Sequence, residues 1–133
     1  MVYCATMTFN LSLLLCDNML VSSTTLAAEI FQFAEAMARA SKAPHTKLNV
    51  RWVSIDGKPV QTSAGFQLTP THSIDDSFTS DLIHIPALWR NPRPPVMKNL
   101  SYIPWLQEQH QRNSRFTAVG TGVCFLAEAG LLD

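Results

Sequence analysis

The chain has 133 residues, enough for one domain with its own hydrophobic core but not for two. Ten basic residues balance ten acidic ones, so the chain lacks the basic surface that free-standing nucleic-acid binding requires. Hydrophobic residues make up 47% of the sequence and charged residues 15%, which excludes wholesale disorder and indicates that some apolar surface meets a partner.

The apolar stretch 11–21 does not have the features of a membrane span or of a secretory signal. It is shorter than the roughly 20 residues that cross a bilayer, and the first basic residue, Arg39, follows it rather than precedes it. Cys4, Cys16 and Cys124 are too few and too widely spaced for a disulfide framework. We therefore expect a cytoplasmic protein without a membrane partner. The histidines stand apart and no Cys-x-x-Cys pair occurs, so we expect no metal and no cofactor.

Residues 10–16 form a nearly continuous apolar run, typical of a strand buried on both faces of a parallel sheet. Four hydroxyl residues at 22–25 then predict the start of a helix that ends near Lys42, before Pro44. Its large apolar residues recur at spacings of four, three and four: Leu26, Ile30, Phe33 and Met37. With Ala27, Phe31, Ala34 and Ala38 they predict a broad core-facing side, which leaves Glu29, Glu35 and Arg39 on the wetter side.

Residues 48–55 alternate as a strand, and 60–68 are predicted to return as a second strand after a turn at 56–59. Because Pro59 and Gly65 weaken ladder pairing, we expect this hairpin at the margin of the sheet. Residues 81–86 form another short buried strand that its proline stops.

Three prolines within residues 90–95 predict an irregular segment. Residues 102–111 follow as a helix, with a proline tolerated only near its first turn. The chain then gives a strand at 116–119, a tight turn at 120–122 and a helix at 123–129. Strands that alternate with helices in this way predict a doubly wound, mostly parallel α/β sheet.

Ligands of open α/β sheets bind beyond the carboxyl ends of the strands. The residues that follow three of the predicted strands are therefore candidate ligand-binding residues: Asp17 and Asn18, then Ala87, Leu88, Trp89 and Arg90, and finally Gly120 and Thr121. A Gly-x-Gly turn between a strand and a helix either holds an anion or presents a nucleophile, although close packing is its commoner use. It is not a dinucleotide fingerprint, because the third glycine is absent.

The stretch AVGTGVCFLAEAGLLD at 118–133 resembles the nucleophile elbow of the PfpI-type, class I glutamine amidotransferase-like superfamily. The branch it resembles most is the N-terminal domain of AraC-family transcriptional regulators. LLLCDNMLVSSTTLAAEIFQFA is similar to that branch's first strand and helix, WVSIDGKPVQTSAGFQLTP to its hairpin, and DLIHIPALWRNPR to its next strand and loop. The resemblance implies a flavodoxin-like, doubly wound sheet with a β-hairpin.

In the enzymes of this superfamily a cysteine nucleophile occupies the elbow, and the matching residue here is Gly120. Glycine has no nucleophilic side chain, so the resemblance implies a chain without catalytic residues. Cys124 lies four residues further on among apolar neighbours, which indicates a core thiol. The oxyanion loop of the enzymes corresponds to residues 86–88, and their acidic partner to a position near Ser23.

The resemblance implies the ligand-sensing and dimerising portion of a transcriptional regulator, a homodimer with a small-molecule effector such as an amino-acid derivative or quaternary amine. Trp89 would suit a cation through its ring face, and Arg90 and Arg93 an anion. The alternative is a hydrolase or amidotransferase relative with a cysteine nucleophile, such as Cys124. A third interpretation is an oligomerisation module without a ligand.

In the family the domain continues through a further strand and then a helix-turn-helix pair, so 1–133 is expected to be a partial sensing domain that ends after the elbow helix. DNA would then be bound only through a C-terminal domain that these residues do not include. The sheet would be incomplete at its C-terminal end, which leaves strand 116–119 at an open apolar edge. We therefore expect self-association.

Overall fold

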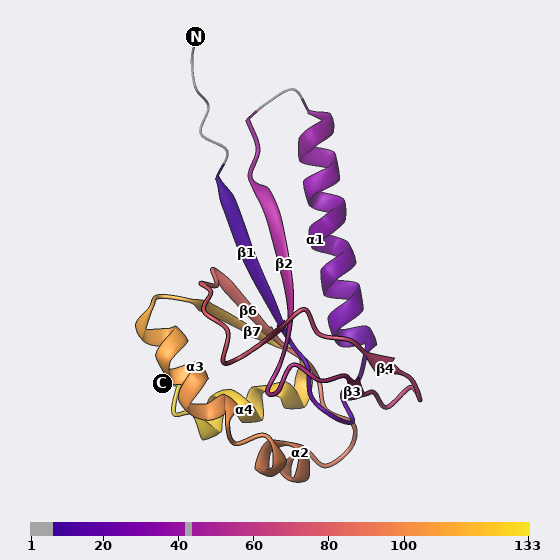
Figure 1. Ribbon diagram of the computed structural model, residues 1–133, viewed down its shortest axis with the longest axis vertical. Helices are drawn as coiled ribbons and strands as arrows, with labels where there is room; N and C mark the ends of the chain where they lie inside the picture. The colour runs from indigo at the N-terminus through magenta and orange to yellow at the C-terminus, as the bar shows by residue number, and fades with distance from the viewer. Residues whose placement is uncertain (1–6, 42–43) are drawn as a thin grey trace.

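The computed structural model describes residues 7–41 and 44–133, so Cys4 and the predicted helix end near Lys42 lie outside it. Five parallel strands form the main sheet in the order β5-β2-β1-β6-β7 (Figure 1). The strands are β1 (Thr8–Leu14), β2 (Lys47–Ser54), β5 (His72–Ser73), β6 (Leu82–Ile85) and β7 (Arg115–Ala118). From β2 to β7 they follow the flavodoxin-like order, and the short β5 adds an edge strand beside β2.

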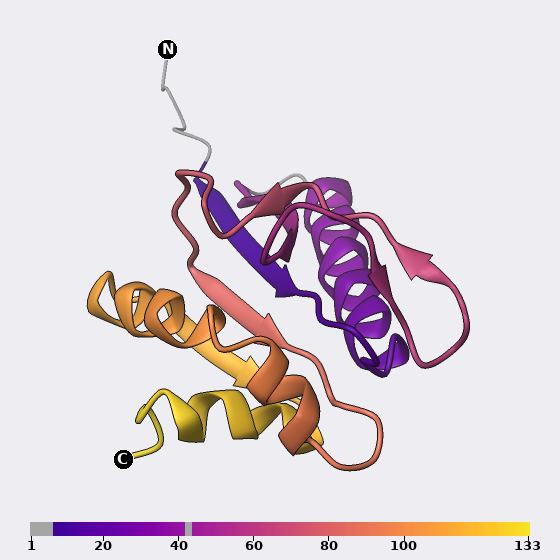
Figure 2. The same ribbon diagram turned by 60° about the horizontal axis from the view of Figure 1, so that its bottom comes forward.

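Helices cover both faces of this sheet, as Figure 2 shows. The long helix α1 (Ser22–Ala40) lies on one face, opposite a group of three shorter helices. These are α2 (Arg93–Lys98), α3 (Tyr102–Gln111) and α4 (Val123–Glu128), the last preceded by the 3-10 turn η1 (Gly120–Gly122). The predicted doubly wound α/β fold is confirmed. Within 7–41 and 44–133, no helix has both the length and the hydropathy to cross a membrane.

The central strand β1 owes its position to its apolar run. Leu11, Leu13 and Leu14 are fully buried, and β1 pairs in parallel with β2 on one side and β6 on the other. A strand of this kind is stable only when both faces are covered. At the far edge β7 pairs with β6, so the predicted edge position of residues 116–119 is confirmed.

The predicted β-hairpin is present, but it lies within 60–68 and does not pair 48–55 with 60–68. The second edge of β2 is occupied by β5 in parallel, and residues 60–68 form a small antiparallel sheet of their own from β3 (Val60–Gln61) and β4 (Gln67–Leu68). The turn is closed locally, because Ser54 Oγ accepts a hydrogen bond from Gly57 N at 2.9 Å. It therefore leads the chain away from the sheet instead of back along β2.

The proline-rich segment is also more regular than the sequence predicts, because α2 begins inside it. Pro94 and Pro95 fall in the first turn of the helix, where backbone N–H groups have no partner within the helix and their loss costs little. Asn91 Oδ1 accepts a hydrogen bond from Arg93 N at 3.1 Å, which gives the first N–H of α2 a partner.

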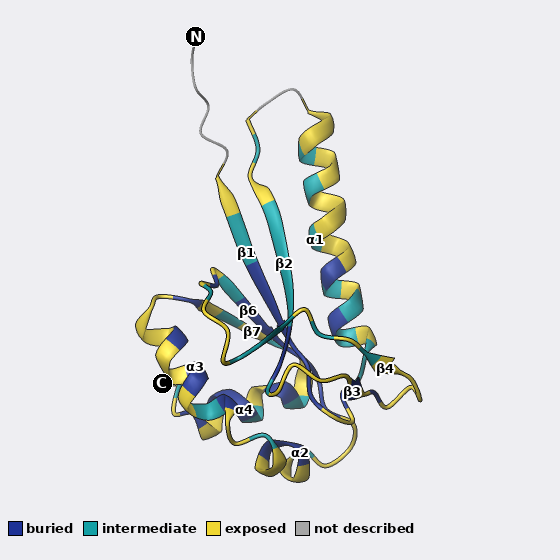
Figure 3. Ribbon diagram, viewed as in Figure 1, coloured by how far each residue is buried: buried dark blue, intermediate teal, exposed yellow. Residues whose placement is uncertain are grey.

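The predicted inner face of α1 is wrong as well. Thr24 and Ala28 are the buried residues of this helix, and Phe31 stacks on Phe9 of β1 with ring centroids 6.1 Å apart. Glu35, predicted on the wet side, accepts a hydrogen bond from the backbone N–H of Leu48 at the sheet. The large apolar residues Leu26, Ile30, Phe33 and Met37 are instead exposed. Figure 3 shows exposed residues along the length of α1.

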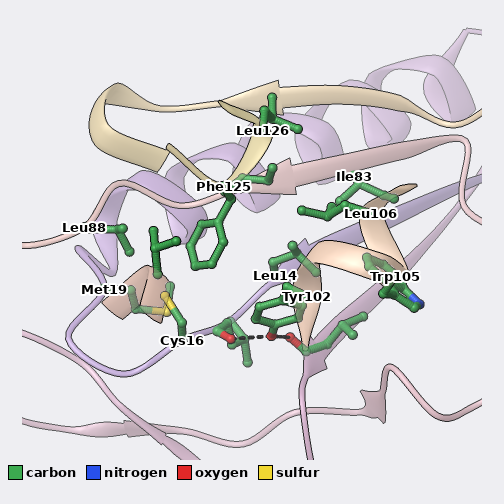
Figure 4. Packing of buried hydrophobic residues seen from close by; sticks show 14 of the residues in the cluster. Leu14, Cys16, Met19, Ile83, Leu88, Tyr102, Trp105, Leu106, Phe125 and Leu126 are labelled. Atoms are coloured by element: carbon green, nitrogen blue, oxygen red, sulfur yellow. Dashed lines mark hydrogen bonds between the residues drawn. The ribbon is translucent and has the colours of Figure 1, made fainter. Parts of the chain in front are cut away.

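The larger core lies between the sheet and the three short helices, and Tyr102 is at its centre (Figure 4). Its ring meets Phe125 of α4 edge-on, with centroids 5.8 Å apart. Its hydroxyl donates to Leu15 O at 2.5 Å and lies 3.1 Å from Val53 O, so α3 is tied to the ends of both central strands.

We predict that Tyr102→Phe lowers the free energy of unfolding by about 1–2 kcal/mol, because it leaves the buried Leu15 carbonyl without this donor. Urea unfolding of both proteins measures the change. Gln111→Ala, at an exposed position of the same helix, is the matched control and should change stability by less than about 0.5 kcal/mol. Equal urea midpoints for Tyr102→Phe and the unmodified chain would contradict the assigned role of the hydroxyl.

Candidate functional site: a strand-to-helix elbow with glycine at its apex

The chain turns sharply from β7 into α4 at Gly120, which has a φ of +50°. Val119 before it is extended, and Gly122 N donates to Val119 O at 2.9 Å to close the turn. A Cβ built on Gly120 would meet the Cβ of Ala87 at 3.8 Å, an ordinary contact. The backbone therefore bends sharply between strand and helix, as in a nucleophile elbow, and the residue at the bend has no side chain.

Gly122 is required by close packing rather than by its backbone angles. Its φ of −59° suits any residue, but an added Cβ would overlap the carbonyl oxygen of Pro86 and lie 3.0 Å from the carbonyl carbon. The start of α4 can approach the end of β6 only because this side chain is absent.

The loop after β6 is held to the elbow and to α1 by side-chain hydroxyls. Thr121 Oγ1 accepts from Leu88 N at 3.0 Å and donates to Leu88 O at 3.1 Å. Ser23 Oγ accepts from Ala87 N at 3.0 Å and donates to Leu20 O at 2.6 Å. Ser23 thus lies beside the loop that matches the oxyanion loop of the enzymes, but it supplies a hydroxyl in place of a carboxylate.

The loop after β1 is hydrogen-bonded both to β3 and to the loop after β6. Asp17 Oδ1 accepts from Gln61 N at 3.0 Å, and Asn18 N donates to Gln61 O at 2.8 Å. Asn18 O in turn accepts from Trp89 N at 3.1 Å. The fully buried Met19 bridges to Thr62 on one side and to Leu88 on the other. Loops far apart in the sequence are therefore joined at one end of the sheet.

All eight sequence-predicted binding residues lie at this end, but they differ in exposure. Leu88 and Ala87 are buried and Thr121 is half-buried, whereas the remaining five are exposed: Asp17, Asn18, Trp89, Arg90 and Gly120. The Arg90 guanidinium lies 5.5 Å from the centroid of the Trp89 ring. A cationic ligand would compete with this guanidinium for the ring.

Three residues at this end of the sheet have positive φ: Asn18 at 66°, Arg90 at 61° and Gly120 at 50°. Asparagine and glycine tolerate this conformation, but for arginine it costs free energy. Strained residues of this kind are enriched at functional sites.

Two hollows border the same end of the sheet. A small one of about 100 Å³ lies between Asp17, Asn18 and Lys98. A larger groove of about 450 Å³ runs between α2 and α4, within the usual size range of small-molecule sites. Its lining is apolar except for Arg93, Glu128 and the thiol of Cys124.

The two described thiols differ in their surroundings. Burial, aided by the charge of Asp17, raises the pKa of Cys16 from 9.0 to about 12, so this thiol stays protonated at neutral pH. Cys124 packs against the core but is half-buried and lines the groove, so it is more accessible than a core thiol is expected to be.

His84 of β6 connects three elements, a role that was not predicted from the sequence. Its Nε2 donates to Ser23 O at 2.8 Å and its Nδ1 lies 2.9 Å from Thr117 Oγ1, so a nearly buried imidazole joins α1, β6 and β7. A histidine inside an otherwise apolar strand was the available signal. Among the described residues, no group of three or more His, Cys, Asp or Glu side chains is arranged to hold a metal ion.

A model of the DJ-1/PfpI family matches residues 18–133. The chain therefore belongs to the DJ-1/PfpI family, as its resemblance to PfpI-type domains predicts. HTH-type transcriptional regulator GbdR from Pseudomonas aeruginosa is 30% identical over 125 residues, which are 93% of this chain and 32% of the regulator. The chain thus spans about a third of the length of this curated relative.

Solved structures agree with the fold. A protein from Vibrio parahaemolyticus superposes with a TM-score of 0.80 at 21% identity, covering 94% of this chain and 63% of the other. An AraC family transcriptional regulator from Pseudomonas putida gives a TM-score of 0.71 at 21% identity, covering 92% and 71%. At such identities the likeness establishes the architecture alone.

We predict that Gly122→Ala lowers the free energy of unfolding by about 1–3 kcal/mol, because the new methyl group overlaps the Pro86 carbonyl. Denaturant unfolding measures the loss. Glu128→Ala, at an exposed position of α4, controls for the change to alanine and should alter stability by less than about 0.5 kcal/mol. A Gly122→Ala protein as stable as the unmodified chain would show that α4 does not need this close approach.

Proposed function

We propose that this chain is the ligand-sensing and dimerising portion of an AraC-type transcriptional regulator, without catalytic activity of its own. In this proposal DNA is bound by a helix-turn-helix domain outside residues 1–133, and the protein acts in the cytoplasm. The neutral net charge and the regulator GbdR among its relatives support this assignment.

One observation carries the proposal: the elbow keeps its bend but has glycine at its apex. Catalysis at an elbow requires a nucleophile on the residue with the strained φ, and Gly120 has none. The neighbouring hydroxyl groups are also bonded to backbone and not free for catalysis. Ser23 Oγ accepts from Ala87 N, and Thr121 Oγ1 accepts from Leu88 N. These side chains are engaged in supporting the loops.

A cysteine-dependent enzyme is the alternative, and Cys124 is the one described thiol with access to solvent. It is the second residue of α4, four residues after Gly120, and it lines the α2–α4 groove. Cys16 is buried, and its raised pKa opposes thiolate formation.

To test the absence of an elbow nucleophile, we compare thiol alkylation of the folded chain with that of Gly120→Cys. A Cβ at position 120 has room, so the variant should gain one rapidly labelled thiol at an exposed site. In the unmodified chain, Cys124 is expected to react at the slow rate of an unactivated thiol near neutral pH, and Cys124→Ser identifies its share. Labelling of Cys124 faster than that of a free thiol would favour the enzyme.

Ligand sensing is tested by thermal unfolding against amino acids, alkylamines and betaines. A compound at a hundred times its Kd stabilises the folded state by about 2.7 kcal/mol, which raises the midpoint by several degrees. We expect Arg90→Ala to change the rise: it should be smaller for amino acids that bind through their carboxylate, which lose the exposed guanidinium, and larger for alkylamines, which no longer compete with it for the Trp89 ring. A rise that is equal in Arg90→Ala would place the ligand elsewhere, and an unchanged midpoint with every compound would favour an oligomerisation module.

A further inference from the structure

The groove between α2 and α4 is built from matching faces of two short helices. The helices contact each other on the face of the sheet opposite α1 (Figure 2). Residues three and four apart lie on one face of a helix. Each helix turns such a face to the groove: Arg93, Val96 and Met97 from α2, and Cys124, Ala127 and Glu128 from α4.

The apolar part of this lining is suited to an apolar ligand. Val96 is buried and Cys124 half-buried, and both pack against the core, so they form the floor of the groove. Met97 and Ala127 are exposed, and 53% of Met97 is accessible. Exposed apolar side chains around a hollow are typical of a binding site.

Two opposite charges line the same groove without neutralising each other. Arg93 and Glu128 are both exposed, and the ion pairs among the described residues lie elsewhere, on α1 and at the end of α3. A ligand with a carboxylate and an ammonium group complements both side chains. A ligand with a single charge is attracted by one and repelled by the other. The charges thus favour a zwitterion.

The separation of the two charges indicates the length of the ligand. A free amino acid has both charges on one carbon atom, so it would need two side chains that converge, whereas Arg93 and Glu128 are not paired with each other in the described structure. A two-residue peptide has its charges at opposite ends of a chain that spans at most about 7 Å. Its size also suits a groove of about 450 Å³, which is several times the hollow beside Lys98.

We propose that the α2–α4 groove binds a short apolar peptide with free ends, two residues long, whose carboxylate meets Arg93 and whose ammonium group meets Glu128. This site goes beyond the proposed function. It requires neither the glycine elbow nor an effector at Trp89 and Arg90, and Cys124 takes no chemical part in it.

Calorimetric titration with the dipeptide Leu-Phe tests the proposal. Two analogues each remove one charge: N-acetyl-Leu-Phe lacks the ammonium group, and Leu-Phe amide lacks the carboxylate. We expect each analogue to bind about tenfold more weakly than Leu-Phe.

Variants of the two charged residues should separate the analogues. Arg93→Ala should weaken Leu-Phe and N-acetyl-Leu-Phe by about tenfold and leave Leu-Phe amide unchanged. Glu128→Ala should weaken Leu-Phe and Leu-Phe amide instead. Lys98→Ala removes another exposed cation of α2 and is the matched control, which should leave all three affinities within about twofold.

Alkylation of Cys124 shows whether the peptide lies in the groove. In a Cys4→Ser background, Cys124 is the accessible thiol of the described residues, so Leu-Phe should slow its reaction with iodoacetamide. Ala127→Trp fills the groove from an exposed position and should abolish both the heat of binding and the protection. Circular dichroism confirms that each variant is folded.

Four results would overturn the site: no heat of binding from Leu-Phe at millimolar concentrations, heat without protection of Cys124, equal affinity for the three peptides, or binding that survives both Arg93→Ala and Glu128→Ala. None of them bears on the elbow or on effector binding at Trp89, because thermal unfolding of Arg90→Ala tests that end separately.

Discussion

The contact between Gly122 and the Pro86 carbonyl sets how closely the elbow approaches β6, and the site depends on this distance. Because α4 begins against the end of β6, Thr121 reaches Leu88 and fixes the loop that follows. That loop bonds to the residues after β1 through Leu20 and Asn18. Because Gly122 has no side chain, the loops that follow β1, β6 and β7 can be held together at one end of the sheet.

The turn between β7 and α4 has the bend of an enzyme elbow, but the residue at its apex, Gly120, has no side chain. The bend needs a positive φ at its apex, and glycine satisfies this demand without strain, whereas a nucleophilic residue must bear it. Gly120 therefore adopts this positive φ without the backbone strain that a residue with a side chain would have there. A positive φ is also found at Arg90, an exposed residue of the neighbouring loop, where a side chain makes this conformation costly.

Much of the fold follows from local signals in the sequence. The buried run of β1 and the proline stop after β6 both form as expected, because each depends on residues within one segment. The predicted pairing of 60–68 with 48–55 does not form, because β5 occupies that edge of β2, and this long-range competition has no local signal. The loops of the site follow from strand order, but no pattern signals that Thr121 and Ser23 hold backbone groups of the β6 loop.

Helix α1 shows most clearly why composition leaves burial undecided. Its apolar residues occupy two sides, and hydrophobicity alone assigns the larger ones to the core. Packing against the sheet selects the smaller side, since Ala28 and Thr24 allow close approach and Glu35 finds a backbone donor at the edge of β2. The bulky side is then left exposed. The inversion of the predicted face thus follows from how closely α1 approaches the sheet.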